Sequence, residues 1–542
     1  MTIRFNGRET DVLCSENYLS LLKRLGTEKG ALAVMAGGQT LSLLSEISGE
    51  DARALTYADE EGRRVYERSL RFVLLMAFER EFPKARVRCE HSHGNGVFFT
   101  VRGMKLTEES LLGIKKRMQE IIQSDLPFTL YPTSRTEAIR YFRSRGDDDK
   151  VKLLKYRPFE YFRMYECGGM MEYFYGIMAP STGYVSVFDL TLVDTGFVLS
   201  LPENGNPDFA GAHRPLPKLE KTFRESARWM EILNIENAAD LNELTASGKI
   251  REFIRVNEAL MDRKIYDIAD EIVKSQARLV LIAGPSSSGK TTFTNRLMIA
   301  LKVTGLSPQK VSLDDYYVNR DQVPKDENGE TDLECLEALD TALLGEHLVK
   351  LMDGETVNIP LYNFETGMRS EKTHAMRVDS HSPILIEGIH GLNERLTPGI
   401  PRGMKFKIYI SSLTNLNIDD HNRIRTTDAR LLRRIVRDAA FRGTDPEQTL
   451  IMWPSVRRGE EKNIFPFQED ADAMINSSLA YELAIMKKYV YPMLTAITPD
   501  KEYYTIARRL VKFLNYIQTA DAEDEVPLNS LLREFIGGSC FY

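Results

Sequence analysis

The residues with the clearest chemical potential form a glycine-rich segment, 284–291, which reads Gly-Pro-Ser-Ser-Ser-Gly-Lys-Thr. The segment fits the P-loop pattern GxxxxGK(S/T) in full, with an apolar run before it and a helical pattern after it. Glycines let backbone N–H groups converge on phosphates at the positively polarised start of a helix. Lys290 would then reach the β- and γ-phosphates of ATP, and the Thr291 hydroxyl would ligate Mg²⁺. A chance glycine-serine turn is the alternative, and the flanking patterns weigh against it.

This motif predicts ATP and Mg²⁺ as cofactors. The predicted ATP-binding residues are Gly284, Pro285, Ser286, Ser287, Ser288, Gly289, Lys290, Thr291 and Thr292.

Carboxylates stand where two later apolar runs end. Asp314 and Asp315 follow the run at 310–313, and Glu387 follows the run at 384–386. In a parallel sheet such strand ends meet at the mouth of the binding site. Asp314 could there accept the proton of an acceptor hydroxyl, and Glu387 suits the Mg²⁺ shell beside Thr291. Acidic turn residues without a catalytic role are the alternative.

A basic helix is predicted after these strands. Arg430, Arg433, Arg434 and Arg437 recur at spacings of three and four, so a helix places them on one face. Such a face is often merely solvated. In a phosphoryl-transfer enzyme it fits a mobile lid that clamps phosphates and offsets developing charge.

The elements that must position these residues alternate apolar runs with helical patterns from residue 278 onward, which predicts a parallel sheet with crossover helices. The predicted strands are 279–283, 310–313, 384–386 and 406–410. The front half mixes strand-like runs, at 2–7, 32–38, 96–101 and 184–188, with a helical pattern at 66–82, and residues 220–275 read as helical throughout. The predicted fold class is therefore α/β, with smaller α+β domains before the P-loop domain.

Composition narrows the function classes. The 542 residues carry a net charge of −7, which counts against a general nucleic-acid or membrane-surface partner. The five scattered cysteines contain no CxxC pair and are typical of free thiols in a reducing cytosol. Neither a signal core nor a run of about 18 apolar residues is evident. We therefore expect a cytoplasmic protein, and the sequence leaves homo-oligomer formation open.

The order of motifs across residues 278–490 resembles the uridine-cytidine kinase branch of the phosphoribulokinase-like P-loop kinases. The matching blocks are 284–292, 312–317 (Ser-Leu-Asp-Asp-Tyr-Tyr), 337–340 (Glu-Ala-Leu-Asp), 359–364 (Ile-Pro-Leu-Tyr-Asn-Phe), 387–389 (Glu-Gly-Ile), the arginine helix and 442–448 (Arg-Gly-Thr-Asp-Pro-Glu-Gln). The resemblance implies a nucleoside kinase.

The resemblance also implies residue roles. Asp314 would be the general base for the sugar 5′-hydroxyl, and Lys290, Arg433 and Arg437 would serve the phosphates and the lid. The implied substrate-binding residues are Tyr317 and Tyr362 against the nucleoside, Asp332 or Glu334 on the ribose hydroxyls, and Gln448 on the sugar. Two departures leave the base identity open: Gly367 stands where a base-contacting histidine is usual, and the segment around Trp453 differs.

The front half resembles the TGS domain and the second additional domain of threonyl-tRNA synthetases. The latter carries HxxxH and CxxxH motifs that converge on an editing cleft, and the corresponding positions here read Arg68, Phe72, Cys167 and Met171. Without these imidazoles the site cannot bind zinc tightly or activate water in that way. His91 and His93 suggest a replacement site, but the glycine-rich residues that follow favour a surface turn. The resemblance therefore implies a structural or ligand-sensing relic.

The resulting domain hypothesis is a TGS-like domain at 1–60, a degenerate editing-domain-like region at 61–205, a helical connector at 206–275, a P-loop nucleoside kinase domain at 276–495 and a C-terminal strand/helix segment at 496–542. The leading functional hypothesis is transfer of the ATP γ-phosphate to a nucleoside 5′-hydroxyl. A kinase of another small hydroxylated metabolite and an RNA-associated regulatory ATPase are the alternatives.

Overall fold

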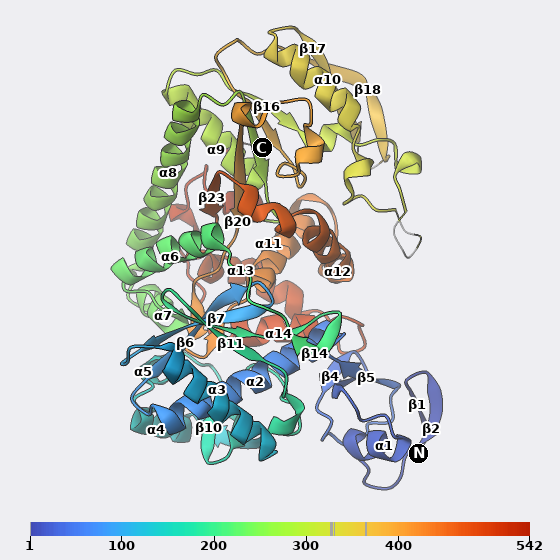
Figure 1. Cartoon of the computed structure of the whole chain (residues 1–542), viewed down its shortest axis with the longest axis vertical. Coiled ribbons are helices and arrows are strands. Elements are labelled where there is room, and N and C mark those ends of the chain that lie inside the picture. Colours follow the sequence, from blue (N-terminus) through green and yellow to red (C-terminus); the bar gives the residue numbers. More distant parts are fainter. Residues whose placement is uncertain (1, 326–328, 330, 364–365, 542) are drawn as a thin grey trace.

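The computed structural model describes residues 2–325, 329, 331–363 and 366–541. Phe364, the last residue of one block of the kinase resemblance, lies outside these residues. Figure 1 shows an elongated molecule in which the front half and the P-loop domain occupy opposite ends, while the C-terminus lies within the P-loop domain.

The first sheet has the strand order β2-β1-β5-β3-β4. Its elements are β1 (Thr2–Phe5), β2 (Arg8–Asp11), α1 (Tyr18–Leu25), β3 (Ala31–Ala36), β4 (Gln39–Leu41) and β5 (Ala52–Thr56). The side chain of Asn17 accepts a hydrogen bond from the N–H of Ser20 and caps α1, and Gly26 ends this helix in the left-handed region. Leu21 and Leu22 of α1 pack with Ile3 of β1 in one small core.

A second region pairs two long helices with an antiparallel sheet of order β11-β12-β7-β6 and a smaller sheet of order β10-β9-β8. Its helices are α2 (Glu60–Glu81), α3 (Glu108–Gln123), α4 (Arg135–Arg145) and α5 (Asp148–Lys155). Its strands are β6 (Arg86–His93), β7 (Gly96–Arg102), β8 (Thr129–Ser134), β9 (Tyr161–Cys167), β10 (Met170–Glu172), β11 (Asp189–Val193) and β12 (Gly196–Ser200).

The strand expected at 184–188 is wrong. Residues Thr182–Tyr184 form the short 3₁₀ helix η1, and no strand follows until β11. The Tyr66 hydroxyl donates to the carbonyl of Val187 and accepts from its N–H, both at 2.8 Å. A tertiary side chain therefore satisfies backbone groups that a neighbouring strand would otherwise bind.

A hairpin precedes the connector helices, and residues 220–275, which the pattern predicts to be helical throughout, form three separate helices. Its elements are β13 (Pro202–Glu203), β14 (Asn206–Ala210), α6 (Pro217–Ile232), α7 (Ala238–Ala246) and α8 (Ile250–Ser275). Helix α8 buries Phe253, Ile254 and Ile265 in the same core as Phe293 of the helix after the P-loop.

The P-loop domain is built on a parallel sheet of order β16-β19-β15-β20-β23. Its strands are β15 (Leu279–Ala283), β16 (Gln309–Ser312), β19 (Ile384–Glu387), β20 (Lys405–Ser411) and β23 (Ala473–Asn476). Every residue of β15 is buried, with Val280 in the core on one face and Leu281 in the core on the other. Burial on both faces explains the continuous apolar runs. The predicted α/β fold is confirmed.

Helices and short hairpins surround this sheet. They are α9 (Lys290–Val303), α10 (Thr341–Met352), β17 (Val357–Asn363), β18 (Met368–Met376), β21 (Asn417–Asp419), β22 (Asn422–Arg423), α11 (Thr426–Phe441), α12 (Pro446–Asn463) and α13 (Glu482–Thr495). The 3₁₀ helices are η2 (Leu313–Tyr316), η3 (Arg320–Gln322), η4 (Leu336–Ala338), η5 (Glu394–Leu396), η6 (Arg402–Met404) and η7 (Phe465–Asp470).

The C-terminal segment has no strand among its described residues, so that part of the expectation for 496–542 is wrong. It consists of α14 (Tyr504–Leu514), η8 (Glu523–Glu525) and α15 (Arg533–Ile536). Leu510, Phe513 and Phe535 are buried in the same core as Val280 of the central strand. The segment therefore completes the core of the P-loop domain.

Candidate active site around the P-loop

The P-loop connects β15 to α9 and takes its shape from close backbone packing. A Cβ on Gly284 would lie 1.9 Å from the carbonyl oxygen of Ile410 on β20, and Gly289 has a φ of +83°. The ammonium of Lys290 donates to the carbonyl oxygens of Gly284, at 2.9 Å, and Pro285, at 3.1 Å. Burial lowers the pKa of Lys290, while the neighbouring carboxylates of Glu534 and Glu387 act in the opposite direction.

Two carboxylates of the chain itself bind N–H groups of this loop. The N–H of Ser286 donates to Oε1 of Glu460 at 2.9 Å. The N–H of Thr292 donates to Oε2 of Glu534 at 3.2 Å, and the Thr292 hydroxyl donates to the same oxygen at 2.9 Å. These carboxylate oxygens stand in for phosphate oxygens, so the loop has the donors that an ATP phosphate needs. The sequence analysis identified neither glutamate.

The residues expected to ligate Mg²⁺ have matching chemistry. Glu387 ends β19 and is 8% exposed, and burial raises its pKa. Its Oε2 has no hydrogen-bond partner among the described residues, and the nearest cation, the ammonium of Lys310, lies 3.6 Å from Oε1. The hydroxyl of Thr291 lies at the start of α9, in the P-loop. A buried carboxylate with a vacant oxygen and a hydroxyl are hard oxygen ligands that fit Mg²⁺.

Asp314 lies in η2, directly after β16, and its side chain is exposed at the mouth of the site. Desolvation by the surrounding walls raises its pKa, and Lys290, Arg442 and Arg437 act in the opposite direction. Three cations thus act on the Asp314 carboxylate. A carboxyl with a raised pKa suits proton abstraction at neutral pH.

Tyr317 and Tyr362 lie together beside Asp314. Their ring centroids are 5.5 Å apart with an interplanar angle of 41°, and the Tyr317 hydroxyl donates to the carbonyl of Leu333 at 2.9 Å. These two rings form an aromatic wall near the loop that carries the expected ribose-binding acids.

Glu334 and Asp332 approach the P-loop from that loop. Burial and the charge of Glu460 raise the pKa of Glu334 to about 7, against opposing effects of Arg434 and Lys290. Asp332 accepts a hydrogen bond from the N–H of Glu334 at 3.1 Å. The structure therefore brings Glu334 into the electrostatic neighbourhood of the P-loop lysine.

The arginine face of α11 packs directly against the P-loop. The Arg430 Nε donates to the carbonyl of Ser286 at 2.9 Å, and an Nη of Arg434 donates to the Ser286 hydroxyl at 2.9 Å. Arg437 lies between Asp438, at 3.5 Å, and Glu534, at 4.0 Å. The helix is thus part of the loop's support.

Arg433 differs from the expected mobile-lid residue. It is fully buried, forms an ion pair with Glu482, donates to the Ser477 carbonyl at 2.8 Å and stacks on Phe535. Because its charge is compensated within the core, Arg433 holds α11 in place and does not face solvent as a lid would require.

Gln448 and Gly367 are the remaining expectations. The Gln448 side chain is exposed in the first turn of α12, where its N–H donates to Asp445 at 2.7 Å. Gly367 has a φ of +71°, and a Cβ there would meet the Arg320 side chain at 2.9 Å. Backbone conformation and crowding both explain why no histidine stands at this position.

The residues at the positions of the synthetase editing motifs serve the packing of the front half. Phe72 is fully buried with its ring centroid 5.5 Å from that of Phe128, and Arg68 donates to the carbonyl of Ile177. Cys167 is buried, and burial raises the pKa of its thiol to about 12. Because the thiolate form of Cys167 is disfavoured, this side chain is a poor metal ligand and a poor nucleophile. The expected surface turn is present at residues 94–95, but His93 itself is only 3% exposed at the end of β6.

Comparison with known proteins finds relatives of two kinds. The phosphoribulokinase/uridine kinase family matches residues 279–483. The chain is 31% identical over 212 residues to the uridine kinase of Macrococcus caseolyticus, which covers 39% of this chain and 93% of that enzyme. It is 30% identical over 165 residues to the threonine–tRNA ligase of Carboxydothermus hydrogenoformans, covering 30% of this chain and 26% of the ligase. A solved structure of a possible uridine kinase from Bacillus stearothermophilus aligns over 39% of this chain and 99% of its own length, at 21% identity and a TM-score of 0.26.

The chain therefore joins a threonine–tRNA ligase-like region to a kinase domain, and through that domain it is a phosphotransferase that belongs to the phosphoribulokinase/uridine kinase family.

Proposed function

We propose that this enzyme transfers the γ-phosphate of ATP to the 5′-hydroxyl of a ribonucleoside. The observation that carries the proposal is the electrostatic proximity of Asp314 and Glu334 to Lys290, beside the paired rings of Tyr317 and Tyr362. A phosphate-binding loop, a base with a raised pKa, a carboxyl for sugar hydroxyls and an aromatic wall are the groups that a nucleoside acceptor needs.

In this mechanism the P-loop amides and Lys290 hold the β- and γ-phosphates, and Asp314 accepts the proton of the 5′-hydroxyl as its oxygen attacks phosphorus. Arg437, which lies near both Asp314 and Lys290, compensates the charge that develops on the transferred group. Mg²⁺ held by Thr291 and Glu387 would supply charge neutralisation between the phosphates. Glu334, assisted by Asp332, and the two tyrosines fix the nucleoside so that the hydroxyl is aligned for transfer.

A neutral sugar with a flat base fits this cleft better than an anionic metabolite does. Glu334 and Asp332 would repel an acceptor phosphate or carboxylate, while both accept hydrogen bonds from ribose hydroxyls. A P-loop that acts only as a switch for bound RNA has no need of Asp314 with two aromatic rings. Because position 367 is a glycine, no histidine at this position contacts the nucleobase. We therefore expect looser discrimination among bases than in ordinary uridine kinases, or a shift toward purines.

The test is a competition assay with uridine, cytidine, inosine, adenosine and their 2′-deoxy forms. Loss of the 2′-hydroxyl leaves a largely buried carboxyl unpaired, so ribonucleosides should exceed deoxyribonucleosides by at least about tenfold in kcat/KM, and Glu334→Ala should shrink that gap. Equal rates on both sugars would exclude the ribose role of Glu334. If none of these nucleosides is phosphorylated, the result would favour the alternative that the enzyme is a kinase of another small hydroxylated metabolite.

The front half is proposed as a structural or ligand-sensing module, with a TGS-like domain at 1–60 and an editing-domain-like region at 61–205 that has lost its synthetase-type catalytic groups. The connector, 206–275, and the kinase domain, 276–495, follow, and the segment 496–542 completes the kinase core. We place the enzyme in the cytosol because its cysteines are all free thiols. No helix in the described ranges is both long and apolar enough to cross a membrane.

A further inference from the structure

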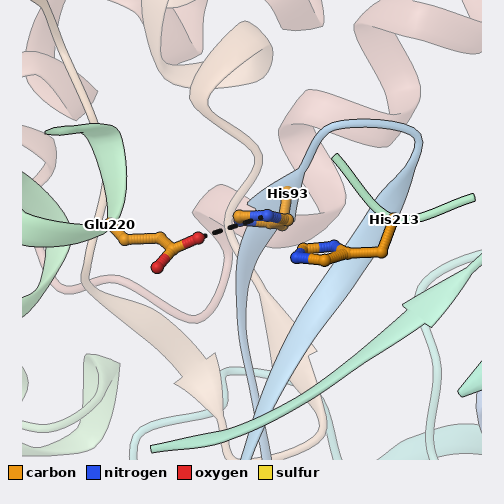
Figure 2. A group of neighbouring side chains, drawn as sticks. All are labelled: His93, His213 and Glu220. Carbon is orange, nitrogen blue, oxygen red and sulfur yellow. Dashed lines mark ion pairs between the residues drawn. The ribbon is translucent and has the colours of Figure 1, made fainter. Parts of the chain in front are cut away.

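A cluster of three potential metal ligands lies outside the kinase site. His93 ends β6, His213 lies in the loop before α6, and Glu220 lies in the first turn of α6. Figure 2 shows the two imidazole rings side by side, with the Glu220 carboxylate directed toward His93. The potential ligand atoms all lie within 4.8 Å of one another.

His93 is the residue that requires an explanation. It is 3% exposed, yet its Nε2 makes no hydrogen bond among the described residues. The nearest partner is Oε1 of Glu220 at 3.5 Å, and the His213 ring centroid lies 4.8 Å away. A buried ring nitrogen without a hydrogen-bond partner costs free energy, and the Glu220 carboxylate does not form that bond in this structure.

The distances between the potential ligand atoms are close to those of a metal centre. Tetrahedral zinc with bonds of about 2.0–2.1 Å places neighbouring ligand atoms roughly 3.4 Å apart. The His93–Glu220 separation of 3.5 Å already meets that value. The His213 side chain is partly exposed, and its ring nitrogen lies within 4.8 Å of the other two ligand atoms.

We propose that His93, His213 and Glu220 bind one zinc ion, with a fourth position open toward solvent. Two imidazoles and one carboxylate favour zinc over Mg²⁺ or Ca²⁺, which prefer sites made wholly of oxygen ligands. The site is distinct from the synthetase motif positions, because none of Arg68, Phe72, Cys167 and Met171 takes part in it.

The position of the ligands indicates what the ion would do. β6 belongs to the synthetase-like region, whereas α6 is fixed to the kinase domain: Glu469 accepts from the N–H groups of Lys218 and Leu219 at 3.0 and 3.1 Å. Leu219 also packs with Tyr409 of β20 in one core. An ion bound here would join the front half, the connecting loop and the kinase domain at a single point. His93 and Glu220 also adjoin a cavity of about 460 Å³, into which the open position could face.

The experiment uses the full chain in excess Mg²⁺, so that the P-loop site does not take up zinc. The protein is stripped with a chelator, reloaded with Zn²⁺ or Co²⁺, desalted and analysed for metal content, visible Co²⁺ absorption and Tm. The wild type should retain about one ion per chain, develop tetrahedral-type Co²⁺ bands and gain thermal stability. Loss of a supporting partner alone costs about 10–100-fold in affinity, so His213→Ala and Glu220→Gln should each weaken binding by more than about 100-fold.

The matched controls are His91→Phe and His381→Ala. His91 lies on the same strand but stacks on Phe223 with ring centroids 3.6 Å apart, and His381 is an exposed histidine of the kinase domain. Both should retain metal content and the Co²⁺ spectrum. Glu220→Gln preserves size and shape, so it distinguishes loss of a ligand from misfolding. Wild-type protein that retains no zinc after loading, or Co²⁺ bands that persist in both ligand variants, would overturn the proposal.

Discussion

At the scale of single residues, Lys290 and Asp314 follow the ends of different strands and lie at the same site. Substitutions of these two residues should have different effects. Lys290→Ala removes the cation that holds phosphates, so ATP affinity and turnover should both fall. Asp314→Asn removes only the proton acceptor, so ATP affinity should change little while kcat falls by about 10²–10⁴. ATP binding by calorimetry and steady-state kinetics separate the two effects. Near-normal turnover in Asp314→Asn would exclude it as the base.

Glu334 predicts a pH dependence of substrate binding. Its pKa of about 7 in the folded enzyme exceeds the ordinary value of 4.5, so the charged carboxylate appears only as pH rises through about 7. The same shift contributes stability below 4.5 that is lost as pH rises through 7. Because the carboxylate accepts ribose hydroxyls more strongly than the acid does, the nucleoside KM should fall as pH rises from about 6 to 8.

The control for this profile is Glu334→Gln. Its KM should be higher and nearly independent of pH over that interval, while the rate still depends on Asp314. A KM inflection that survives unchanged in Glu334→Gln would assign it to another group.

At the scale of elements, we expect the short helix α15 to compete with ATP for the P-loop. Glu534 accepts hydrogen bonds from the N–H and hydroxyl of Thr292, which are donors that the phosphates also need. Hydrogen bonds to a charged acceptor are roughly twice as strong as neutral ones. Glu534→Gln should therefore lower the KM for ATP by several-fold.

The matched control is Glu525→Gln in η8. Glu525 belongs to the same C-terminal segment but pairs with Arg251 and Arg255 at the surface, away from the P-loop. Its KM for ATP should equal that of the wild type. A higher KM in Glu534→Gln would mean that this carboxylate helps to hold the nucleotide and does not compete with it.

At the scale of the whole molecule, the kinase domain inserts its β21–β22 hairpin into the front half. The Asn417 amide donates to the carbonyl of Cys89 at 2.6 Å, and the ammonium of Lys150 lies 3.6 Å from Glu172 and 3.7 Å from Asp419. The Lys150, Glu172 and Asp419 side chains are at most 3% exposed. These buried charges join the two halves.

Lys150→Met should therefore destabilise the whole chain. It removes the buried cation beside Asp419 and leaves Glu172 with His421 alone, which costs about 3–5 kcal/mol. Thermal and urea unfolding measure that loss. Lys152→Met is the control, because Lys152 is exposed and lies 3.5 Å from Asp240, where such pairs contribute about 0–1 kcal/mol. Equal losses in both variants would show that the buried network does not couple the halves.

The sequence by itself determined the features that depend on neighbouring residues. The P-loop, the strand on either side of it and the parallel sheet follow from glycine spacing and apolar runs, because backbone conformation and burial on both sheet faces constrain consecutive positions. For the same reason Asp314 and Glu387 could be placed at strand ends. The strand predicted at 184–188 failed because the side chain of Tyr66 satisfies that backbone from a distant helix.

Only the tertiary structure decided which distant groups meet. Glu460 and Glu534 contact the P-loop from segments far along the chain. Arg433 pairs with Glu482 in the core, so no local sequence pattern could show that Arg433 is buried. The cluster of His93, His213 and Glu220 forms because α6 packs across β6 while also packing on the kinase sheet. Such contacts depend on how helices and sheets pack on one another, and that packing has no counterpart in the spacing of residues along the chain.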